Sequence, residues 1–299
     1  MTQDSSAPSG FANSLKLDCT TADTSIASGE ILKIEQRIEG QNLQAFAKGT
    51  SDAKPFAVSF YVKGNASATY VCELFDGDNT RHVCKTFSVT TDWTRVELSF
   101  PADTTGAFDD DNAASLYLQI FLHAGSNFSS GTLPSTWASK TNANRAAGGS
   151  SFFDSTDRTF FITGVQLEVG QNATEFEHEP FEVSLIKCKR YFERINSLSS
   201  SSSVLGVGFQ YNNDPQSVYQ SRFSEKRTTP SLAVSNVSHL QRIRAGTSSV
   251  NSDISSISFS GTSKIGTLHD VTSQSNNLGE GCYLRFQSTD GTLDYDAEL

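Results

Sequence analysis

Apolar and polar residues alternate along much of the first 170 residues of the chain. Residues 56–62 show the pattern plainly, because every second position is apolar: Phe56, Val58, Phe60 and Val62. The same period of two returns in residues 94–100 and in residues 115–123. A period of two places successive side chains on opposite faces of an extended backbone. These segments are therefore predicted to be β-strands with one buried face.

Five further segments have the composition and length of strands: SLKLDC, ILKIEQRIE, TYVCELFD, HVCKTFSV and FFITGVQLEV. The 21 Phe residues against a single Met also favour strands over a helical bundle. About eight antiparallel strands of this length are most simply arranged as a jelly-roll sandwich. The predicted fold class is all-β, with an N-terminal jelly-roll sandwich, a short connecting helix and a smaller C-terminal β-sandwich domain.

The period changes after residue 179. Five apolar positions then recur at spacings of 4, 3, 4 and 3 residues: Phe181, Leu185, Cys188, Phe192 and Ile195. This is the spacing of a helical seam, and Pro180 suits a first helical turn. Either the helix runs through Ile195, or it ends near Cys188 and the segment RYFERI begins a strand. We expect the seam to dock, by preference on the sandwich and otherwise on sister chains near a symmetry axis.

Four segments are predicted along the chain: a flexible entry segment (1–10), the jelly-roll domain (11–179), the helix with a Ser-rich linker (180–203) and the C-terminal β domain (204–299). Two connections inside the jelly roll, residues 101–114 and 124–151, are longer than hairpins require. Loops of such length in a compact domain are usually functional or disordered.

The charge balance argues against several kinds of partner. The formal net charge is −10, and no cluster of Lys and Arg provides the basic face that nucleic-acid binding needs. The densest basic run, KCKRYFER, is short and contains Glu193, so a solvated face is the better interpretation. The chain shows neither a long apolar run nor a secretory signal. We expect no nucleic-acid binding and no membrane insertion.

The five cysteines show no metal-binding spacing, and no metal or other cofactor is expected. Cys72 and Cys84 lie symmetrically about the turn FDGDNTR and could face each other across a hairpin. Because no export signal is present, reduced thiols in the core are the expected state. The turns FDGDN and FDDDN offer carboxylates for Ca²⁺, but Asp is frequent in turns for conformational reasons, and a structural turn is the preferred interpretation.

The sequence contains no clear catalytic motif. Glycoside hydrolysis needs two carboxyl groups that face each other at about 5–9.5 Å, and turn aspartates such as Asp109 and Asp110 predict no such pair. A GxSxG nucleophile elbow and a phosphate-binding glycine loop are both absent from the sequence. We therefore expect a protein that is not an enzyme.

Carbohydrate binding is the remaining chemistry. Sugars stack their CH-rich faces on aromatic rings while polar side chains take the hydroxyl groups. The connection of residues 124–151 holds such a set: Trp137, Phe128, Asn127, Asn142, Asn144 and Arg145. A lone Trp in a long loop more often anchors that loop on the sandwich, which is the preferred interpretation of Trp137, with a sugar platform as the alternative. Trp93 leads into a strand and is expected in core or edge packing.

Several segments carry a resemblance to a known family. They include QRIEGQNLQAFAKGTSDAKPFAVSFYVKG, FPADTTGAFDDDN, NANRAAG and, most specifically, GVQLE.G..AT.FE..PFE..L.KC.RYF between Gly164 and Phe192. In these segments the chain resembles tail-fibre and related appendage proteins of marine tailed phages, cyanophage-like and pelagiphage-like. The resemblance is strong over the first two-thirds of the chain and looser beyond. It implies a jelly-roll module of the carbohydrate-binding type, but it supplies no ligand-binding residues.

The resemblance also implies a role and a location. We expect a structural virion protein, assembled in the host cytoplasm, that acts as a tail fibre or tail-associated adhesin and binds host surface polysaccharide. Its expected partners are other virion proteins and further copies of itself in a homotrimer. Many relatives carry a long virion-anchoring region where this chain has a short segment, so its anchor would lie elsewhere or on a partner. The alternatives are a head fibre or capsid decoration protein without receptor binding and, less favoured, a glycan-cleaving tailspike.

Overall fold

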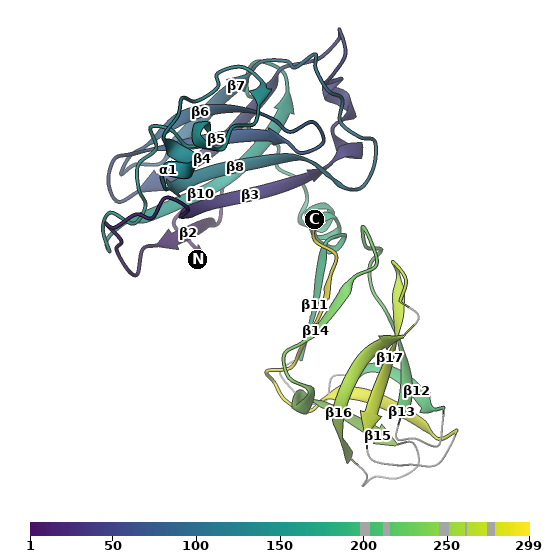
Figure 1. The fold of residues 1–299 in the computed structure, drawn as a ribbon. Coiled ribbons are helices and arrows are strands. Elements are labelled where there is room, and N and C mark those ends of the chain that lie inside the picture. Colours follow the sequence, from purple (N-terminus) through teal and green to yellow (C-terminus); the bar gives the residue numbers. More distant parts are fainter. Residues whose placement is uncertain (198–203, 212–215, 245–250, 261, 274–278) are drawn as a thin grey trace. The chain divides into compact units, whose positions relative to one another are not determined.

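The computed structural model divides the chain into two compact units, Met1–His178 with Leu299, and Glu179–Glu298 (Figure 1). The described residues are 1–197, 204–211, 216–244, 251–260, 262–273 and 279–299. Most of the predicted Ser-rich linker, residues 198–203, lies outside them.

The first unit consists of two five-stranded antiparallel sheets. Sheet A has the order β1 (Thr2–Asp4), β2 (Ser14–Asp18), β10 (Thr159–Val169), β4 (Phe56–Gly64) and β7 (Thr94–Phe100). Sheet B has the order β3 (Ile31–Glu39), β8 (Ala114–Ala124), β5 (Ala68–Asp76), β6 (Arg81–Val89) and β9 (Ala138–Ser139). Short helices occur in the connections: η1 (Gly40–Asn42), η2 (Gln44–Phe46), α1 (Ser126–Ser129) and η3 (Asn142–Asn144).

A single hydrophobic core joins the inner faces of these sheets. The apolar positions predicted from the alternation lie in it, including all four from β4 and Leu116, Leu118, Ile120 and Leu122 from β8. The period of two is thus confirmed as the pattern of a sandwich. The first ten residues differ from the expected flexible segment, because β1 pairs with β2 and extends sheet A.

The second unit is also built from strands. Its helices are α2 (Phe181–Lys189) and η4 (Val237–His239), and β11 (Phe192–Asn196), β19 (Thr292–Asp296) and β14 (Ser231–Val234) form a three-stranded sheet. Six strands form a closed barrel in the order β12 (Val204–Gln210), β13 (Gln216–Arg222), β17 (Gly266–Ser273), β16 (Asn251–Ser260), β15 (Leu240–Arg244) and β18 (Gly281–Phe286) (Figure 1). The β-rich class is confirmed. The expected C-terminal sandwich is instead a barrel, because β12 pairs with both β13 and β18 and leaves no open edge.

The helix ends near Cys188, which is the shorter of the two predicted lengths. Because α2 stops at Lys189, Phe192 and Ile195 belong to β11, where a separation of three residues places them on opposite faces. Ile195 packs against the core of the second unit. The apolar residues of α2 are exposed, with 75% of Phe181 and 69% of Ile186 accessible. No helix in the described part of the chain is both long and apolar enough to cross a bilayer.

The hairpin of β5 and β6 separates its two cysteines. The register pairs Cys72 with Lys85 and Cys84 with Glu73, so the two thiols belong to opposite faces of sheet B. Cys72 lies in the core and Cys84 on the outer face, both as free thiols. Burial raises the pKa of each thiol well above its ordinary value. The facing pair that the sequence left open does not form, because the hairpin register does not place Cys72 opposite Cys84.

Lys48 is a buried cation that links its own connection to the end of β5 and to the connection of residues 101–114. Its ammonium group lies 2.5 Å from a carboxylate oxygen of Asp76 and 3.2 Å from one of Asp103. It also donates to the main-chain oxygens of Thr105 and Gly106, at 3.0 and 2.7 Å. The first acidic turn therefore serves as a counter-charge, since Asp76 is fully buried against Lys48.

Replacing Lys48 by Met is expected to destabilise the first unit by about 3–5 kcal/mol, because Asp76 would keep a buried charge without its cation, while Asp103 would keep only Arg81. Urea denaturation followed by tryptophan fluorescence measures the loss. Lys54→Met is the matched control, since Lys54 is exposed and its replacement is expected to change the free energy of unfolding by less than about 0.5 kcal/mol. Equal stability of the two variants would contradict the structural role of Lys48.

Candidate functional site

The outer face of sheet B carries three parallel rows of side chains, set by the strand register. The aromatic row contains Arg37, Tyr117, Phe75 and His82. The polar row contains Glu35, Gln119, Glu73 and Cys84. The third row contains Lys33, Phe121, Val71 and Thr86. These positions alternate with the core residues of the same strands, so all three rows point away from the sandwich core.

The long connection of residues 124–151 covers part of this face. Ala146 from the connection packs in a small cluster with Val71, Cys84 and Phe121. The connection is folded on itself by main-chain hydrogen bonds, including Ala146 N–H to Phe128 O at 2.8 Å. Val71 and Phe121 of the third row, and Cys84 of the polar row, therefore lie beneath the connection.

Arg145 fixes the connection to the sheet. Its guanidinium group donates three hydrogen bonds to the carboxylate of Glu73, at 3.1, 3.1 and 2.7 Å, and one to Gln119 Oε1 at 2.6 Å. Both charged groups are buried. Burial opposes ionisation of Glu73, but hydrogen bonds from His82 and Arg145 outweigh it and hold the pKa below its ordinary value. The pair is a buried, bidentate ion pair of the kind that restricts geometry strongly.

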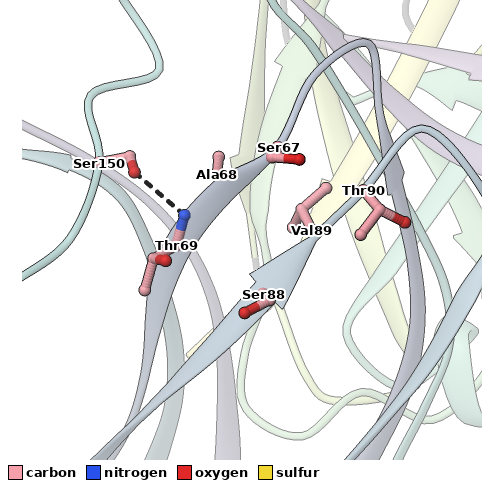
Figure 2. A pocket seen from close by; sticks show the side chains of 7 residues that line it. All are labelled: Ser67, Ala68, Thr69, Ser88, Val89, Thr90 and Ser150. Carbon is pink, nitrogen blue, oxygen red and sulfur yellow. Dashed lines mark hydrogen bonds between the residues drawn. The ribbon is translucent and has the colours of Figure 1, made fainter.

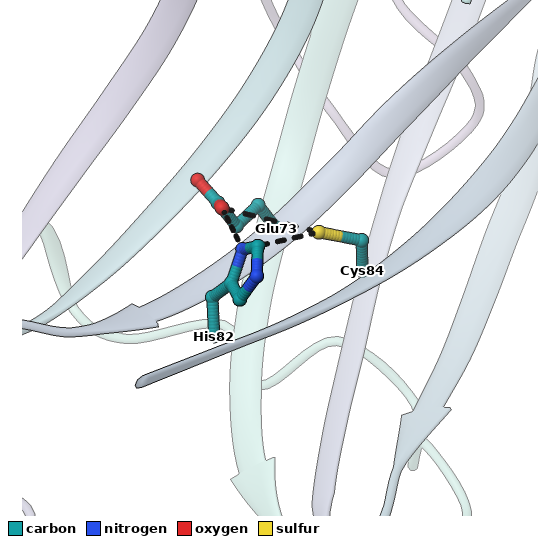
Figure 3. Close-up of side chains that lie close together, drawn as sticks. All are labelled: Glu73, His82 and Cys84. Atoms are coloured by element: carbon teal, nitrogen blue, oxygen red, sulfur yellow. Dashed lines mark hydrogen bonds and ion pairs between the residues drawn. The ribbon is translucent and has the colours of Figure 1, made fainter. Parts of the chain in front are cut away.

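Glu73, His82 and Cys84 form a tight buried group beside this pair (Figure 3). Their ligand-type atoms all lie within 4.8 Å of one another, and Glu73 Oε1 is 2.8 Å from His82 Nδ1. Two contacts disfavour a metal ion between them. Arg145 already places a positive charge on Glu73. The N–H of Thr141 approaches His82 Nε2 at 3.4 Å, which favours the tautomer with its proton on Nδ1, turned toward Glu73. The arrangement therefore fits a hydrogen-bond network better than a metal centre.

The aromatic row is the part of this face that stays partly open. The rings of Phe75 and Tyr117 lie 5.3 Å apart at 44°, and both are half-buried. Arg37 lies over Tyr117 at 5.5 Å, and Lys140 lies over Phe75 at 4.8 Å. Arg37 and Lys33 also bind Glu35. Burial would raise the pKa of Glu35, but these hydrogen bonds outweigh it and lower that pKa.

The glycan-binding residues expected from the sequence are not assembled into a surface platform. Only 8% of Trp137 is accessible, its indole N–H donates to Pro101 O at 2.8 Å, and its ring packs 5.5 Å from that of Phe56. Trp137 is thus a core residue that anchors its loop, which was the preferred interpretation. The alternative, in which this ring forms a sugar platform, is wrong. Arg145 is likewise buried in its ion pair.

The remaining expected residues shape the connection itself. Asn127 donates its main-chain N–H to Ser28 O, and Asn144 Oδ1 accepts from the N–H of Thr132 at 3.0 Å. Phe128 is half-buried and accepts the Ala146 N–H described above, whereas Asn142 is exposed at the start of η3. The alternation in residues 115–123 places Tyr117 on the face of β8 opposite the core. Sequence reasoning missed its partner Phe75, whose outward position follows from the same alternation in β5.

A shallow hollow lies at the opposite end of the β5–β6 hairpin (Figure 2). Its volume is about 350 Å³, and it is lined by Ser67, Ala68, Thr69, Ser88, Val89, Thr90 and Ser150. Ser150 Oγ accepts the main-chain N–H of Thr69 at 3.0 Å. A hollow of about 470 Å³ in the second unit is lined by Gln220, Arg222, Phe223, Ser263, Ile265, Gly266 and Thr267. The first hollow presents hydroxyl groups without a charged or aromatic side chain, so it offers less chemistry than the aromatic row.

Residues 170–178, the exit segment, fold back along β10 at the end of the first unit. Glu168 accepts hydrogen bonds from the hydroxyl and the main-chain N–H of Thr174, the latter at 3.1 Å. Gln166 Oε1 accepts the N–H of Glu177 at 2.8 Å. Gln166 and Glu168 belong to the QLE part of the family-like pattern, Thr174 to its AT part and Glu177 to its FE part. These residues of the pattern therefore have a structural role, since they fasten the exit segment to β10.

Aromatic packing completes this closure. The ring of Phe11 lies 5.0 Å from that of Phe176, 5.1 Å from His178 and 5.2 Å from Tyr61. Gly164 has a φ of 60°, and a Cβ there would lie 2.6 Å from Cζ of Phe11. The first glycine of the pattern is needed both for its left-handed backbone and for the close approach of Phe11.

Comparisons with known proteins add little to this geometry. No family model matches the chain, and no curated protein matches it. Among solved structures, the crystal structure of Cucumber Necrosis Virus aligns over 95% of this chain and 84% of that chain, with 11% identity and a TM-score of 0.19. Superposition at this level supports neither a shared fold nor a shared function.

Glu73→Gln is expected to destabilise the first unit by about 3–5 kcal/mol at pH 7, because Arg145 would lose its buried counter-charge. The pKa of Glu73 is lowered on folding, so its ionisation stabilises the fold above the ordinary carboxyl pKa of about 4.3 and ceases to do so as the pH falls through the folded-state value. The difference in unfolding free energy between wild type and variant should therefore shrink in acid.

Urea denaturation at a series of pH values between about 3 and 7 measures this difference. Glu175→Gln is the control, since Glu175 is exposed. Its stability is expected to follow that of wild type at every pH. A Glu73→Gln difference that stayed constant from neutral to acid pH would refute the ionised state of Glu73 in the fold.

Proposed function

We propose that this chain is a structural protein of a tailed-phage virion, a tail fibre or tail-associated adhesin that contacts glycans on the host surface. The observation that carries the proposal is the pattern from Gly164 to Phe192, which resembles appendage proteins of marine phages. The structure supports the proposal by giving that pattern a physical purpose. Gly164, Glu168 and Thr174 close the sandwich where the chain passes to its second unit.

The architecture suits an adhesive and mechanical role. The β-sandwich presents a partly open aromatic row beside charged side chains, and such rows suit weak contacts with sugars. Several copies on one particle would turn weak contacts into strong attachment through effective concentration. In this role the protein has no catalytic step to perform.

The proposed assembly is a homotrimer, as in many of the proteins that the chain resembles. The exposed apolar residues of α2 support self-association: Phe181, Val183, Leu185 and Ile186. Apolar side chains gathered in one short helix are a common sign of an interface. A symmetric oligomer would bury the same residues of every copy at once.

Immunogold labelling of intact virions, with antibody raised against the native chain, tests the assignment. Gold at the tail or its fibres is the expected result. Gold over the capsid would instead favour a head fibre or decoration protein. The absence of label, with an antibody shown to bind the native protein, would refute the virion assignment.

The double variant Phe181→Ser/Ile186→Ser is expected to be monomeric where the wild-type protein is trimeric, because it removes two of the most exposed apolar side chains of α2. Size-exclusion chromatography with light scattering measures the mass. Ile26→Ser/Ile31→Ser is the matched control, since these exposed residues belong to the first unit and their replacement should leave the trimer intact. A wild-type monomer at micromolar concentration would contradict the proposed assembly.

A further inference from the structure

The aromatic row of sheet B is held rigidly from below and from the sides. Phe75 and Tyr117 are direct cross-strand neighbours, and a Cβ at Gly77 would lie 2.8 Å from Cε2 of Tyr117. The Tyr117 ring thus lies against the turn after β5. The guanidinium group of Arg145 lies 5.8 Å from the Phe75 ring and is itself fixed by Glu73. Rings held in this way lose little conformational entropy when a ligand stacks on them.

The charge around the row is opposite in sign to that of the whole chain. Among the side chains at the row, Lys33, Arg37 and Lys140 contribute three positive charges and Glu35 one negative charge, a balance of +2, whereas the chain carries −10. Arg37 also donates a hydrogen bond to the main-chain oxygen of Leu299, so Lys140 is the cation of the row that is most open to a ligand. Arg145 and Glu73 cancel each other. A positive patch on an acidic protein attracts anionic ligands.

We propose that the aromatic row binds an acidic polysaccharide, with the CH face of a pyranose ring stacked on Tyr117 and a sugar carboxylate bound by Lys140. Glu35 accepts hydrogen bonds from sugar hydroxyl groups. The rings favour a sugar over a simple anion, because stacking requires an extended CH-rich face. The proposal deepens the adhesive role proposed above and rests on it, and it moves the glycan site from Trp137 to the strands of sheet B.

Sheet A offers the strongest rival surface. On its outer side Trp93 and Phe161 lie 6.1 Å apart, with Lys16 and Lys63 within 6.0 Å of the Phe161 ring. That surface lacks the buried Arg145–Glu73 pair that fixes the row on sheet B. Its residues are therefore suited to serve as matched controls for the same chemistry.

Isothermal titration of the full chain with oligogalacturonate, a uronic-acid polymer, tests the site against neutral dextran. The wild-type protein is expected to bind only the acidic polymer. Tyr117→Ala and Lys140→Glu are each expected to weaken binding about tenfold, and Tyr117→Phe is expected to retain it because the ring remains. Trp93→Ala and Lys63→Glu make matched changes on sheet A and are expected to leave the affinity unchanged.

Several outcomes would overturn the site. Equal binding of poly-glutamate would show a general anion patch without sugar recognition. Loss of binding in Trp93→Ala, with Tyr117→Ala unaffected, would place the site on sheet A. If Tyr117→Ala fails to fold, as judged by circular dichroism, Lys140→Glu decides by itself, since its side chain is only half-buried. Absence of binding by wild-type protein would refute the inference, while tail labelling by immunogold would still support the proposed virion role.

Discussion

The first unit depends on one buried ion pair, that of Arg145 with Glu73. A carboxylate buried on the outer face of a sheet is stable only when a cation and hydrogen bonds compensate its lost hydration. The connection of residues 124–151 supplies that cation, and in doing so it is drawn over the sheet. The pair thereby decides which part of the face is covered and which part, around Phe75 and Tyr117, stays accessible.

Lys48 shows the same principle at another place in the sandwich. Its ammonium group neutralises Asp76 and Asp103 and binds main-chain oxygens of the 101–114 connection. The ring of Trp137 lies 5.3 Å from the same ammonium group. The connection of residues 124–151 is therefore fixed to the sandwich both through Arg145 and through Trp137. Both long connections are therefore ordered by buried charge, although neither has regular strands of much length. Loops fixed in this way give a scaffold on which the exposed rings are preorganised.

Much of the fold was predictable because alternation is a local property. The strands of the sandwich, the early end of the helix as one of two outcomes, and the outward position of Tyr117 all follow from residue periods. Closure of the C-terminal strands into a barrel was not predictable, since it depends on the pairing of β12 with β18, far apart in sequence. The contacts that hold Trp137 in the core were not predictable for a similar reason, although its role as a loop anchor was the preferred interpretation.

The sequence by itself determined the β-rich class, the two faces of each strand and the break in period after residue 179. These depend on the geometry of neighbouring residues and need no long-range contact. The tertiary structure alone decided that Trp137 packs against Phe56, that Arg145 meets Glu73 across 72 residues, and that Cys72 and Cys84 face opposite sides. Such outcomes depend on strand order and register, which bring distant residues together and which local patterns do not encode.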